Sequence, residues 1–356
     1  MTPLPRSASQ AFGPYTLLGE IARGGMAEVL FARRNDTPTG ELCALKRILP
    51  IHRNEPTFMR FFQAEAQLAL QLKHQNLVET LEAGEVDGIP YLAMEYLHGR
   101  SLSRLIQAFS TRATRLALCY GAYVGVRALA GLEAAHQARD AAGNPLCAVL
   151  CDISPSNVVI RYDGEVKLID FGIAVSRAKL MEQIGWLKGK KHFMAPEQLR
   201  GMPVGPPADV FSLGLTLLNL FAGAPVRAEK SEFELEEAIR QARLPRLDAL
   251  RPEVPLALAD VLARALAKEP GDRYPSALEF AAALAPFACL GKGQPVTAAD
   301  FAKVLAAFVP SLKVEDDIRL GQVLSLGVGA FTDLPASMDV TPLTYEPGRT
   351  LTSHQH

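Results

Sequence analysis

The chain has few cysteines and almost no net charge. Of its 356 residues only five are cysteine, at positions 43, 119, 147, 151 and 289. An odd number of cysteines without a C-x-x-C pair argues against a disulfide framework and favours a reducing environment. The 37 lysine and arginine residues are balanced by 38 acidic residues. This balance argues against a polybasic protein that binds nucleic acid.

The sequence also lacks a long apolar run and an internal repeat. Its most apolar stretch, residues 116–135, is interrupted by Arg127 and Glu133. A bilayer span needs roughly 20 apolar residues, so we expect no membrane span. The first twelve residues contain no apolar segment of the kind found in secretory signals. The absence of a repeating period argues against a solenoid or a propeller, and we expect a cytoplasmic protein.

Hydrophobic residues make up 49% of the chain and charged residues 21%, which is typical of a globular protein with a core. Residues 15–50 alternate β-type runs with turns and predict three antiparallel strands. A helix is expected over residues 58–72. Two further strands, 77–85 and 90–96, are joined by a turn at Asp87-Gly88. The first part of the chain is therefore expected to form a small lobe built mainly of strands.

The second part of the chain has mainly helical patterns. A long helix is expected over about residues 116–138, followed by short strands around Val149, residues 158–160 and residues 166–169. Residues 209–223 and 256–269 are the clearest later helices. The order predicts an α+β fold of two lobes, with a β-sheet and one helix in the first lobe, residues 13–95, and a larger helical lobe at 96–288.

Both ends of the chain are expected to lie outside this unit. Residues 1–12 are predicted to be a flexible N-terminus. Residues 289–340 are predicted to form an extension in which Thr297-x-x-Asp300 caps one short helix. We expect this helix to pack on the large lobe, although a docking role is the alternative. Residues 341–356 are rich in Ser and Thr and are predicted to be disordered.

A glycine-containing segment, residues 22–29, lies between two predicted strands. It is therefore not a dinucleotide-binding fingerprint, which needs a strand followed by a helix. The small residues Gly24, Gly25 and Ala27 would let backbone N–H groups approach phosphates closely. The segment alone fits a hairpin over phosphates and an ordinary tight turn equally well.

Lys46 and Glu65 are expected to lie on inward faces. Alternation along the strand puts Lys46 on the same face as Leu42 and Ala44, and Glu65 shares a helical face with phenylalanines. Each residue alone is more simply interpreted as a solvated surface charge. Because burying either charge alone costs several kcal/mol, the two together indicate an ion pair.

A third group of polar residues follows the long helix. Asp152 and Asn157 lie in one turn segment, and Asp170 begins an Asp-Phe-Gly triplet at the end of a predicted strand. Carboxylate and amide oxygens are ligands that Mg²⁺ accepts together with phosphates. These positions indicate a magnesium-dependent phosphate site.

At this point the sequence resembles the protein kinase superfamily, in particular the bacterial Hanks-type serine/threonine kinases. The resemblance covers about residues 13–288 and rests on motifs that occur in order. The motifs are the glycine-containing hairpin, Ala44-x-Lys46, Glu65, Asp152 with Asn157, Asp170-Phe171-Gly172, Ala195-Pro196-Glu197, Asp209 and Arg273.

The resemblance implies a role for each catalytic position. Lys46, held by Glu65, would grip the α- and β-phosphates of ATP. Asp152 would orient the attacking hydroxyl and accept its proton. Asp170 and Asn157 would hold Mg²⁺ or Mn²⁺. The implied reaction is transfer of the γ-phosphate of ATP to serine or threonine in a protein substrate.

The resemblance also implies which residues would surround the nucleotide. Met94 would be the gatekeeper at the back of the pocket, and Glu95 to Leu97 would form the hinge. Glu197 and Arg273 would form a structural ion pair. The positions implied to contact ATP are Ala22, Gly24, Gly25, Val29, Ala44, Lys46, Met94, Glu95, Leu97 and Val159.

Several positions depart from the family pattern. Leu150 and Cys151 replace the histidine and arginine that precede the catalytic aspartate, and Ser154 replaces a lysine. Lys190 replaces a threonine of the peptide platform. Between Asp170 and Glu197 the only hydroxyl residue is Ser176, with Ile184 and Trp186 at positions where kinases carry phosphorylatable threonines. Control by phosphorylation of this loop is therefore not expected.

These departures leave three hypotheses for function. The intact set of catalytic positions favours an active protein kinase. The altered catalytic loop suggests, as the alternative, a pseudokinase scaffold that binds nucleotide with little or no transfer, since losing one preorganised charge can reduce the rate roughly 100- to 1,000-fold. A small-molecule kinase is the third hypothesis, and the Ala195-Pro196-Glu197 segment with Arg273 argues against it.

Overall fold

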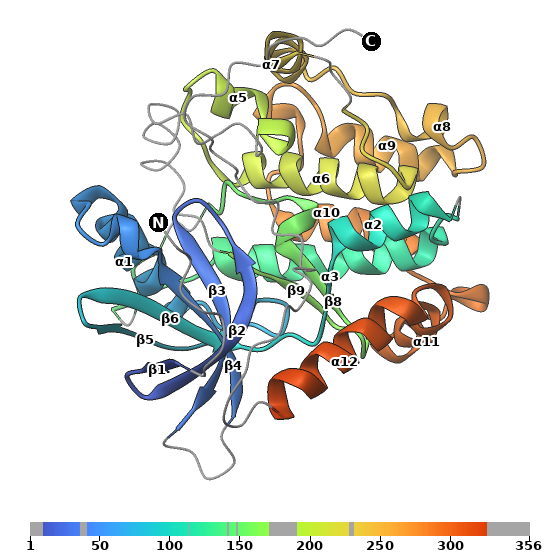
Figure 1. The fold of residues 1–356 in the computed structure, drawn as a ribbon. Helices are drawn as coiled ribbons and strands as arrows, with labels where there is room; N and C mark the ends of the chain where they lie inside the picture. Colours follow the sequence, from blue (N-terminus) through green and yellow to red (C-terminus); the bar gives the residue numbers. More distant parts are fainter. Residues whose placement is uncertain are drawn as a thin grey trace, which may run out of the picture.

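The computed structural model describes residues 10–35, 41–112, 114–140, 142–146, 149–170, 191–227 and 231–325. Within them the chain forms a small lobe of strands and a larger helical lobe (Figure 1). The two-lobed α+β fold predicted from the sequence is confirmed.

The small lobe is a six-stranded antiparallel sheet in the order β1-β2-β3-β4-β6-β5. Its strands are β1 (Gln10–Phe12), β2 (Tyr15–Arg23), β3 (Ala27–Arg34), β4 (Leu42–Ile48), β5 (Thr80–Val86) and β6 (Ile89–Glu95). A short 3-10 helix (Pro50–His52) and helix α1 (Pro56–Gln71) connect β4 to β5. The predicted hairpin turn is present, since Asp87 and Gly88 both have positive φ, as a tight two-residue turn requires.

The two faces of this sheet carry separate cores. One face packs Phe12, Tyr15 and Leu45 with Tyr91. The other face, directed at the large lobe, packs Leu18, Ile21 and Phe31. This division follows from the two-residue alternation of side chains along a strand.

The large lobe contains a second, three-stranded antiparallel sheet of β7 (Gly99–Ser101), β8 (Val158–Arg161) and β9 (Val166–Leu168). Its helices are α2 (Leu102–Thr111), α3 (Leu118–His136), α5 (Pro196–Leu199), α6 (Pro206–Ala222), α7 (Glu232–Arg240), α8 (Leu247–Leu250), α9 (Leu256–Ala265) and α10 (Ala277–Leu284). Its 3-10 helices are Pro155–Asn157, Lys191–Phe193, Pro270–Asp272, Ala285–Phe287 and Gly291–Gly293.

Helix α6 is the centre of the large lobe. Its residues from Ala208 to Phe221 are all buried. A helix that is apolar on every side must be enclosed by other elements, and here α3, α9 and α10 pack around it. Gly223 ends the helix in the left-handed conformation that glycine adopts without strain.

Two helices follow the large lobe, α11 (Ala298–Phe308) and α12 (Pro310–Ser325). The capping box predicted for α11 is present, because Thr297 and Asp300 exchange hydrogen bonds. Phe301 packs against Tyr120 and Tyr123 of α3, so α11 lies on the large lobe as expected. Helix α12 was not predicted, and it extends from α11 towards the strands of the small lobe (Figure 1).

The structure corrects two further expectations. Gln10–Phe12, predicted to be part of a flexible N-terminus, form β1, because Phe12 buries its ring edge-on to Tyr91. Val149, expected in a strand, has no strand conformation, and β7 pairs with β8 instead. The described helices include none that is both long and apolar enough to cross a membrane. Residues 1–9 and the segment 341–356, predicted to be disordered, lie outside the described residues.

Candidate active site

The glycine-containing segment is the tip of the β2–β3 hairpin. The N–H of Gly24 donates to the carbonyl of Ala27 over 2.8 Å and closes the tip. The strand register pairs Ala22 with Val29 and Val29 with Lys46. The hairpin therefore lies directly beside the strand that carries the candidate phosphate-binding lysine.

A buried carboxylate stiffens this hairpin next to its tip. Glu28 is 3% exposed and accepts hydrogen bonds from Arg23 on β2 and Arg47 on β4, at 2.5 and 2.8 Å. A buried charge is tolerated when it is paired in this way. Glu28 was not predicted from the sequence, because its only signal is a charge within a strand between Ala27 and Val29.

The candidate adenine positions come from both lobes. On the small lobe, Ala44 of β4 is paired with Met94 of β6, and both remain partly exposed. On the large lobe, Val159 of β8 is buried, and Leu97 is buried in the segment that joins the lobes. The sheet register thus places the predicted gatekeeper opposite Ala44.

Lys46 joins elements that are far apart in the sequence. Its Nζ donates to Oε1 of Glu65 on α1 over 2.5 Å and to Oδ1 of Asp170 after β9 over 2.6 Å. The side chains of Lys46 and Glu65 are 13% and 7% exposed. The ion pair predicted from the burial of these two charges is confirmed, and Asp170 extends it across the two lobes.

Asp152 and Asn157 lie on the loop before β8. The side-chain Nδ2 of Asn157 donates to the backbone carbonyl of Asp152 over 2.7 Å. The backbone carbonyl of Asn157 accepts from the N–H of Ile169, the residue before Asp170. The β8–β9 pairing therefore brings Asn157 beside Asp170, as the sequence motifs require.

Asp209 on α6 holds the loop that contains Asp152 in place. Its two carboxylate oxygens accept the backbone N–H groups of Leu150 and Cys151 at 2.8 and 2.7 Å, and His136 lies 2.8 Å from the carboxylate. Asp209 is fully buried, so the loop is fixed by a charge-assisted contact inside the core. The sequence did not predict that His136 is a partner of Asp209.

Cys151 occupies a strained position in this loop. Its φ is +54°, in the left-handed region that non-glycine residues rarely adopt. Burial raises the pKa of the Cys151 thiol well above its usual value, and the negative charges of Asp209 and Asp152 raise it further. The thiol is therefore neutral at physiological pH and provides no positive charge that could bind a phosphate.

A second ion pair fixes the segment between the lobes. The carboxylate of Glu95 accepts from Nζ of Lys167 on β9 at 2.5 Å and from the N–H of Glu79 at 2.8 Å. Lys167 is three residues before Asp170. The hinge is thus tied to the strand that carries Asp170, a link that sequence reasoning missed because Lys167 resembles any lysine in a short strand.

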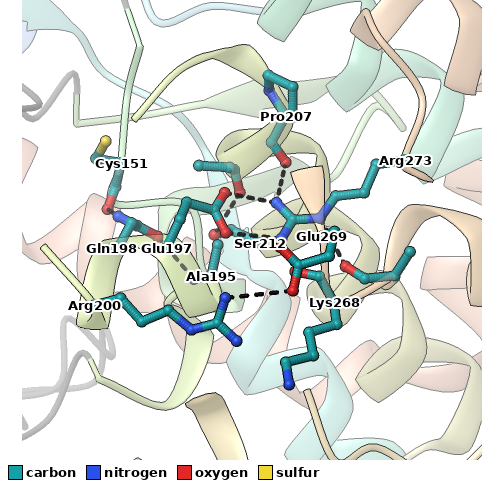
Figure 2. A network of polar contacts seen from close by, with 12 residues as sticks. Cys151, Ala195, Glu197, Gln198, Arg200, Pro207, Ser212, Lys268, Glu269 and Arg273 are labelled. Atoms are coloured by element: carbon teal, nitrogen blue, oxygen red, sulfur yellow. Dashed lines mark hydrogen bonds and ion pairs between the residues drawn. The ribbon is translucent and has the colours of Figure 1, made fainter. Parts of the chain in front are cut away.

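Helix α5 is anchored by a buried ion pair (Figure 2). The guanidinium of Arg273 binds both carboxylate oxygens of Glu197 at 2.7 and 2.8 Å, and both side chains are almost fully buried. The amide of Gln198 accepts from the N–H of Ala195 and donates to the carbonyl of Cys151. The predicted Glu197–Arg273 pair is confirmed, and Gln198 connects it to the loop of Asp152.

Asn157 and Asp170 fit a divalent cation. Asn157 is 6% exposed and its amide nitrogen is engaged by Asp152, which leaves the amide oxygen as the atom that can bind a cation. Asp170 contributes a carboxylate. These are hard oxygen donors of the kind that Mg²⁺ or Mn²⁺ takes beside phosphates.

The positions that depart from the family pattern are only partly described. Ser154 precedes the 3-10 helix Pro155–Asn157 and is partly exposed. Phe171, Gly172 and the segment with Ser176, Ile184, Trp186 and Lys190 lie outside the described residues.

The chain was compared with known protein families and structures. The model of the protein kinase domain matches residues 15–283. The chain is 38% identical over 280 residues to the tyrosine-protein kinase MasK of Myxococcus xanthus, covering 78% of this chain and 43% of MasK. It is 31% identical over 271 residues to the serine/threonine-protein kinase PrkC of Bacillus subtilis, covering 76% of this chain and 40% of PrkC.

The fold is similar to a solved structure as well. The PknI kinase domain of Mycobacterium tuberculosis superposes with a TM-score of 0.61 and 29% sequence identity, covering 81% of this chain and all of that one. The chain spans less than half the length of the curated relatives MasK and PrkC.

Proposed function

Because the chain belongs to the protein kinase domain family, we propose that it transfers the γ-phosphate of ATP to serine or threonine hydroxyls of a protein substrate. The observation that carries this proposal is Lys46 Nζ lying within 2.6 Å of both Glu65 and Asp170. A lysine held by a glutamate and next to a metal-binding aspartate is the arrangement that phosphoryl transfer uses.

Each residue of the site has a defined task in this reaction. Lys46 binds the α- and β-phosphates, and Glu65 keeps it in place. Asp152 orients the substrate hydroxyl and accepts its proton as the phosphoryl group leaves. Asn157 and Asp170 hold the metal. Magnesium, when bound, neutralises the charge that develops on the phosphates.

The nucleotide is held by the remaining predicted positions. The apolar side chains of Val29, Ala44 and Val159 contact the two faces of the adenine, with Met94 behind it and the backbone from Glu95 to Leu97 at its edge. The hairpin of Ala22, Gly24 and Gly25 covers the phosphates, since small residues allow its N–H groups to approach an anion.

The hydroxyl class is the least constrained part of the proposal. MasK is named a tyrosine kinase, whereas PrkC is named a serine/threonine kinase. Ser154 replaces the lysine with which serine/threonine kinases neutralise the transferred phosphate. We propose serine or threonine because PrkC of Bacillus subtilis and PknE of Mycobacterium tuberculosis are named serine/threonine kinases.

A pseudokinase scaffold is the second candidate, and Cys151 is the observation that favours it. A neutral, partly buried thiol and Leu150 replace two functional side chains next to Asp152. A small-molecule kinase is disfavoured because the buried Glu197–Arg273 pair builds the platform on which protein kinases bind peptides.

Phosphate transfer followed by mass spectrometry tests the proposal. The chain is incubated with ATP, Mg²⁺ or Mn²⁺ and a generic basic protein, with Asp152→Ala as the inactive control. We expect phosphoserine or phosphothreonine with the wild type and at least a 100-fold loss with the variant. Phosphotyrosine alone would reject the hydroxyl class. Equal, negligible transfer by both proteins with nucleotide still bound would favour the scaffold.

A further inference from the structure

Helix α12 contacts both lobes of the molecule. Its buried residues Asp316, Arg319 and Val323 recur at a spacing of three and four, which places them on one face of the helix. Val314 and Ile318 lie on the opposite face and are 55% and 56% exposed. The helix therefore has one side that packs against the protein and one that faces solvent.

The first half of the buried face is attached to the large lobe. The carboxylate of Asp316 accepts from Nε of Arg100 on β7 at 2.6 Å and from the hydroxyl of Tyr162 at 2.5 Å. Arg100 is 1% exposed and Asp316 is 3% exposed. A buried pair of this kind fixes geometry, since each charge loses a large part of its compensation if the other moves away.

The second half of the buried face is attached to the small lobe. Arg319 donates to the backbone carbonyl of Glu20 on β2, and its guanidinium lies over the ring of Phe31 on β3, 5.2 Å from the ring centre. Arg33, also on β3, donates to the carbonyl of Leu324 at 3.3 Å. The helix thus holds both strands of the glycine-containing hairpin.

Val323 also attaches α12 to the small lobe, by packing on the face of the sheet that is directed at the large lobe. It is fully buried in one cluster with Leu18, Ile21, Ala22 and Phe31. Val29 and Ala44, two of the proposed adenine contacts, pack against the same cluster. The residue held by Arg319, Glu20, is two positions before Ala22, where the hairpin begins to cover the proposed nucleotide.

The helix packs beside the proposed nucleotide contacts and leaves several of them partly exposed. With α12 in place, Val29, Ala44 and Met94 all remain partly exposed. Ala22, another of the proposed nucleotide contacts, is buried in the cluster with Val323. The contacts on Glu20, Phe31 and Arg33 instead lie along the flank of the hairpin.

We propose that α12 is a positioning element that sets the distance between the β2–β3 hairpin and the large lobe, and so strengthens nucleotide binding. The proposal rests on the nucleotide site proposed above. Arg100 and Tyr162 anchor the helix on one lobe, and Arg319 and Val323 transmit that position to the other. Among the described residues, the small lobe is also joined to the large lobe through the hinge, the contact of Lys46 with Asp170, and the backbone hydrogen bonds of Asn76 and Val78 with Leu168.

Binding of a fluorescent ATP analogue with Mg²⁺ to the full chain tests this role. The variants are Arg319→Met, which keeps most of the apolar packing, and Val323→Asp, which places a charge in the buried cluster. The matched control is Ile318→Asp on the exposed face of the same helix. We expect the dissociation constant to rise at least tenfold in the two variants and less than twofold in the control. An unchanged or lower dissociation constant in Arg319→Met and Val323→Asp would overturn the proposal.

Hydrogen exchange of the protein without nucleotide provides a readout that does not depend on ATP. We expect faster exchange of the amides of residues 17–33 in both variants, and no change in the large-lobe helix α6 or in the control. If the hairpin amides exchanged at the wild-type rate in both variants, the positioning role would also be overturned. If the wild type bound no nucleotide at all, the proposed function would fail, and the exchange result alone would decide what α12 does.

Discussion

Ser154 is the residue at which this chain departs from its family with the clearest chemical consequence. It lies between Asp152 and Asn157 on a loop whose backbone is otherwise fixed by Asp209. A serine cannot neutralise the charge on a phosphoryl group in transit. Under the proposed function, the site would therefore keep the groups that position substrate and metal and would lack one charge that stabilises the transition state.

We predict that Ser154→Lys increases the turnover number. A preorganised charge at the transition state is worth roughly 100- to 1,000-fold in rate, so an increase of at least tenfold is expected from a lysine that is not optimally placed. Initial rates of peptide or protein phosphorylation at saturating ATP give the measurement. Ser154→Met, with similar length and no charge, is the control and is expected to stay near the wild-type rate. A rate for Ser154→Lys that did not exceed the control would show that the missing charge does not limit transfer.

Cys151 is predicted to resist alkylation in the folded protein. Its pKa is raised by burial and by the nearby charges of Asp209 and Asp152, so the reactive thiolate is depleted at pH 8. We expect iodoacetamide to modify Cys151 more than tenfold more slowly in buffer than in concentrated urea, where the thiol regains its ordinary pKa. Peptide mapping by mass spectrometry reports the rate at this position. Rapid modification of Cys151 in the folded chain would contradict the assignment of a neutral, inert thiol.

At the scale of elements, α5 is held in place by one buried ion pair. Arg273 donates two hydrogen bonds to the carboxylate of Glu197 and also donates to the carbonyls of Pro207, Lys268 and Ala267. Gln198 connects α5 to the loop of Asp152, because its side-chain amide donates to the carbonyl of Cys151 (Figure 2). The pair is therefore a structural support for the active site rather than part of the chemistry.

Removing one partner of this pair is predicted to be costly. Arg273→Met leaves the carboxylate of Glu197 buried without its cation, and we expect the free energy of unfolding to fall by about 3 to 5 kcal/mol. The matched control is Arg200→Met, which removes the more exposed contact of Arg200 with Glu269 and its hydrogen bond to the carbonyl of Arg240, and is expected to cost about 1 kcal/mol or less. Urea denaturation monitored by circular dichroism measures both. Equal losses for the two variants would show that the burial of the pair does not matter.

The elements differ in how much of them could be predicted from the sequence. Strands β2 to β6 and helices α1, α3 and α6 have strong periodic patterns, and the Asp87-Gly88 pair is typical of a two-residue hairpin turn. Helix α12 has no such pattern, because two of its buried residues are charged. Asp316 and Arg319 are buried only because Arg100 and the carbonyl of Glu20 lie opposite them, and both partners are distant in sequence. A single sequence contains no signal for such contacts.

The residues of the site also differ in how well they could be predicted from the sequence. Lys46 and Glu65 were paired correctly because two charges on apolar faces are tolerated mainly when they compensate each other. Lys167 was missed because its partner, Glu95, belongs to a segment whose path between the lobes is set by tertiary packing. The order of motifs identified the family, whereas the supporting contacts required the fold.

At the scale of the whole molecule, the contacts of Lys46 with Glu65 and Asp170 connect the two lobes. Under the proposed function, nucleotide and metal would replace part of this contact, since Lys46 would bind the phosphates and Asp170 would bind the cation. The predicted consequence is that metal and nucleotide stabilise the protein together. Without the cation, the negative charge of Asp170 stands close to the phosphates and opposes binding.

We therefore predict that Mg²⁺ and ATP raise the stability of the whole chain cooperatively. At a free nucleotide concentration about 100 times the dissociation constant, the free energy of unfolding is expected to rise by about 2.7 kcal/mol. Chelation of the metal is expected to remove most of this gain, and Asp170→Asn is expected to make the remaining gain independent of Mg²⁺. Urea denaturation of the full chain with ATP, with ATP and Mg²⁺, and with chelator provides the comparison. Equal stabilisation with and without metal would mean that Asp170 does not organise the site, and no stabilisation by either would indicate a scaffold that works without nucleotide.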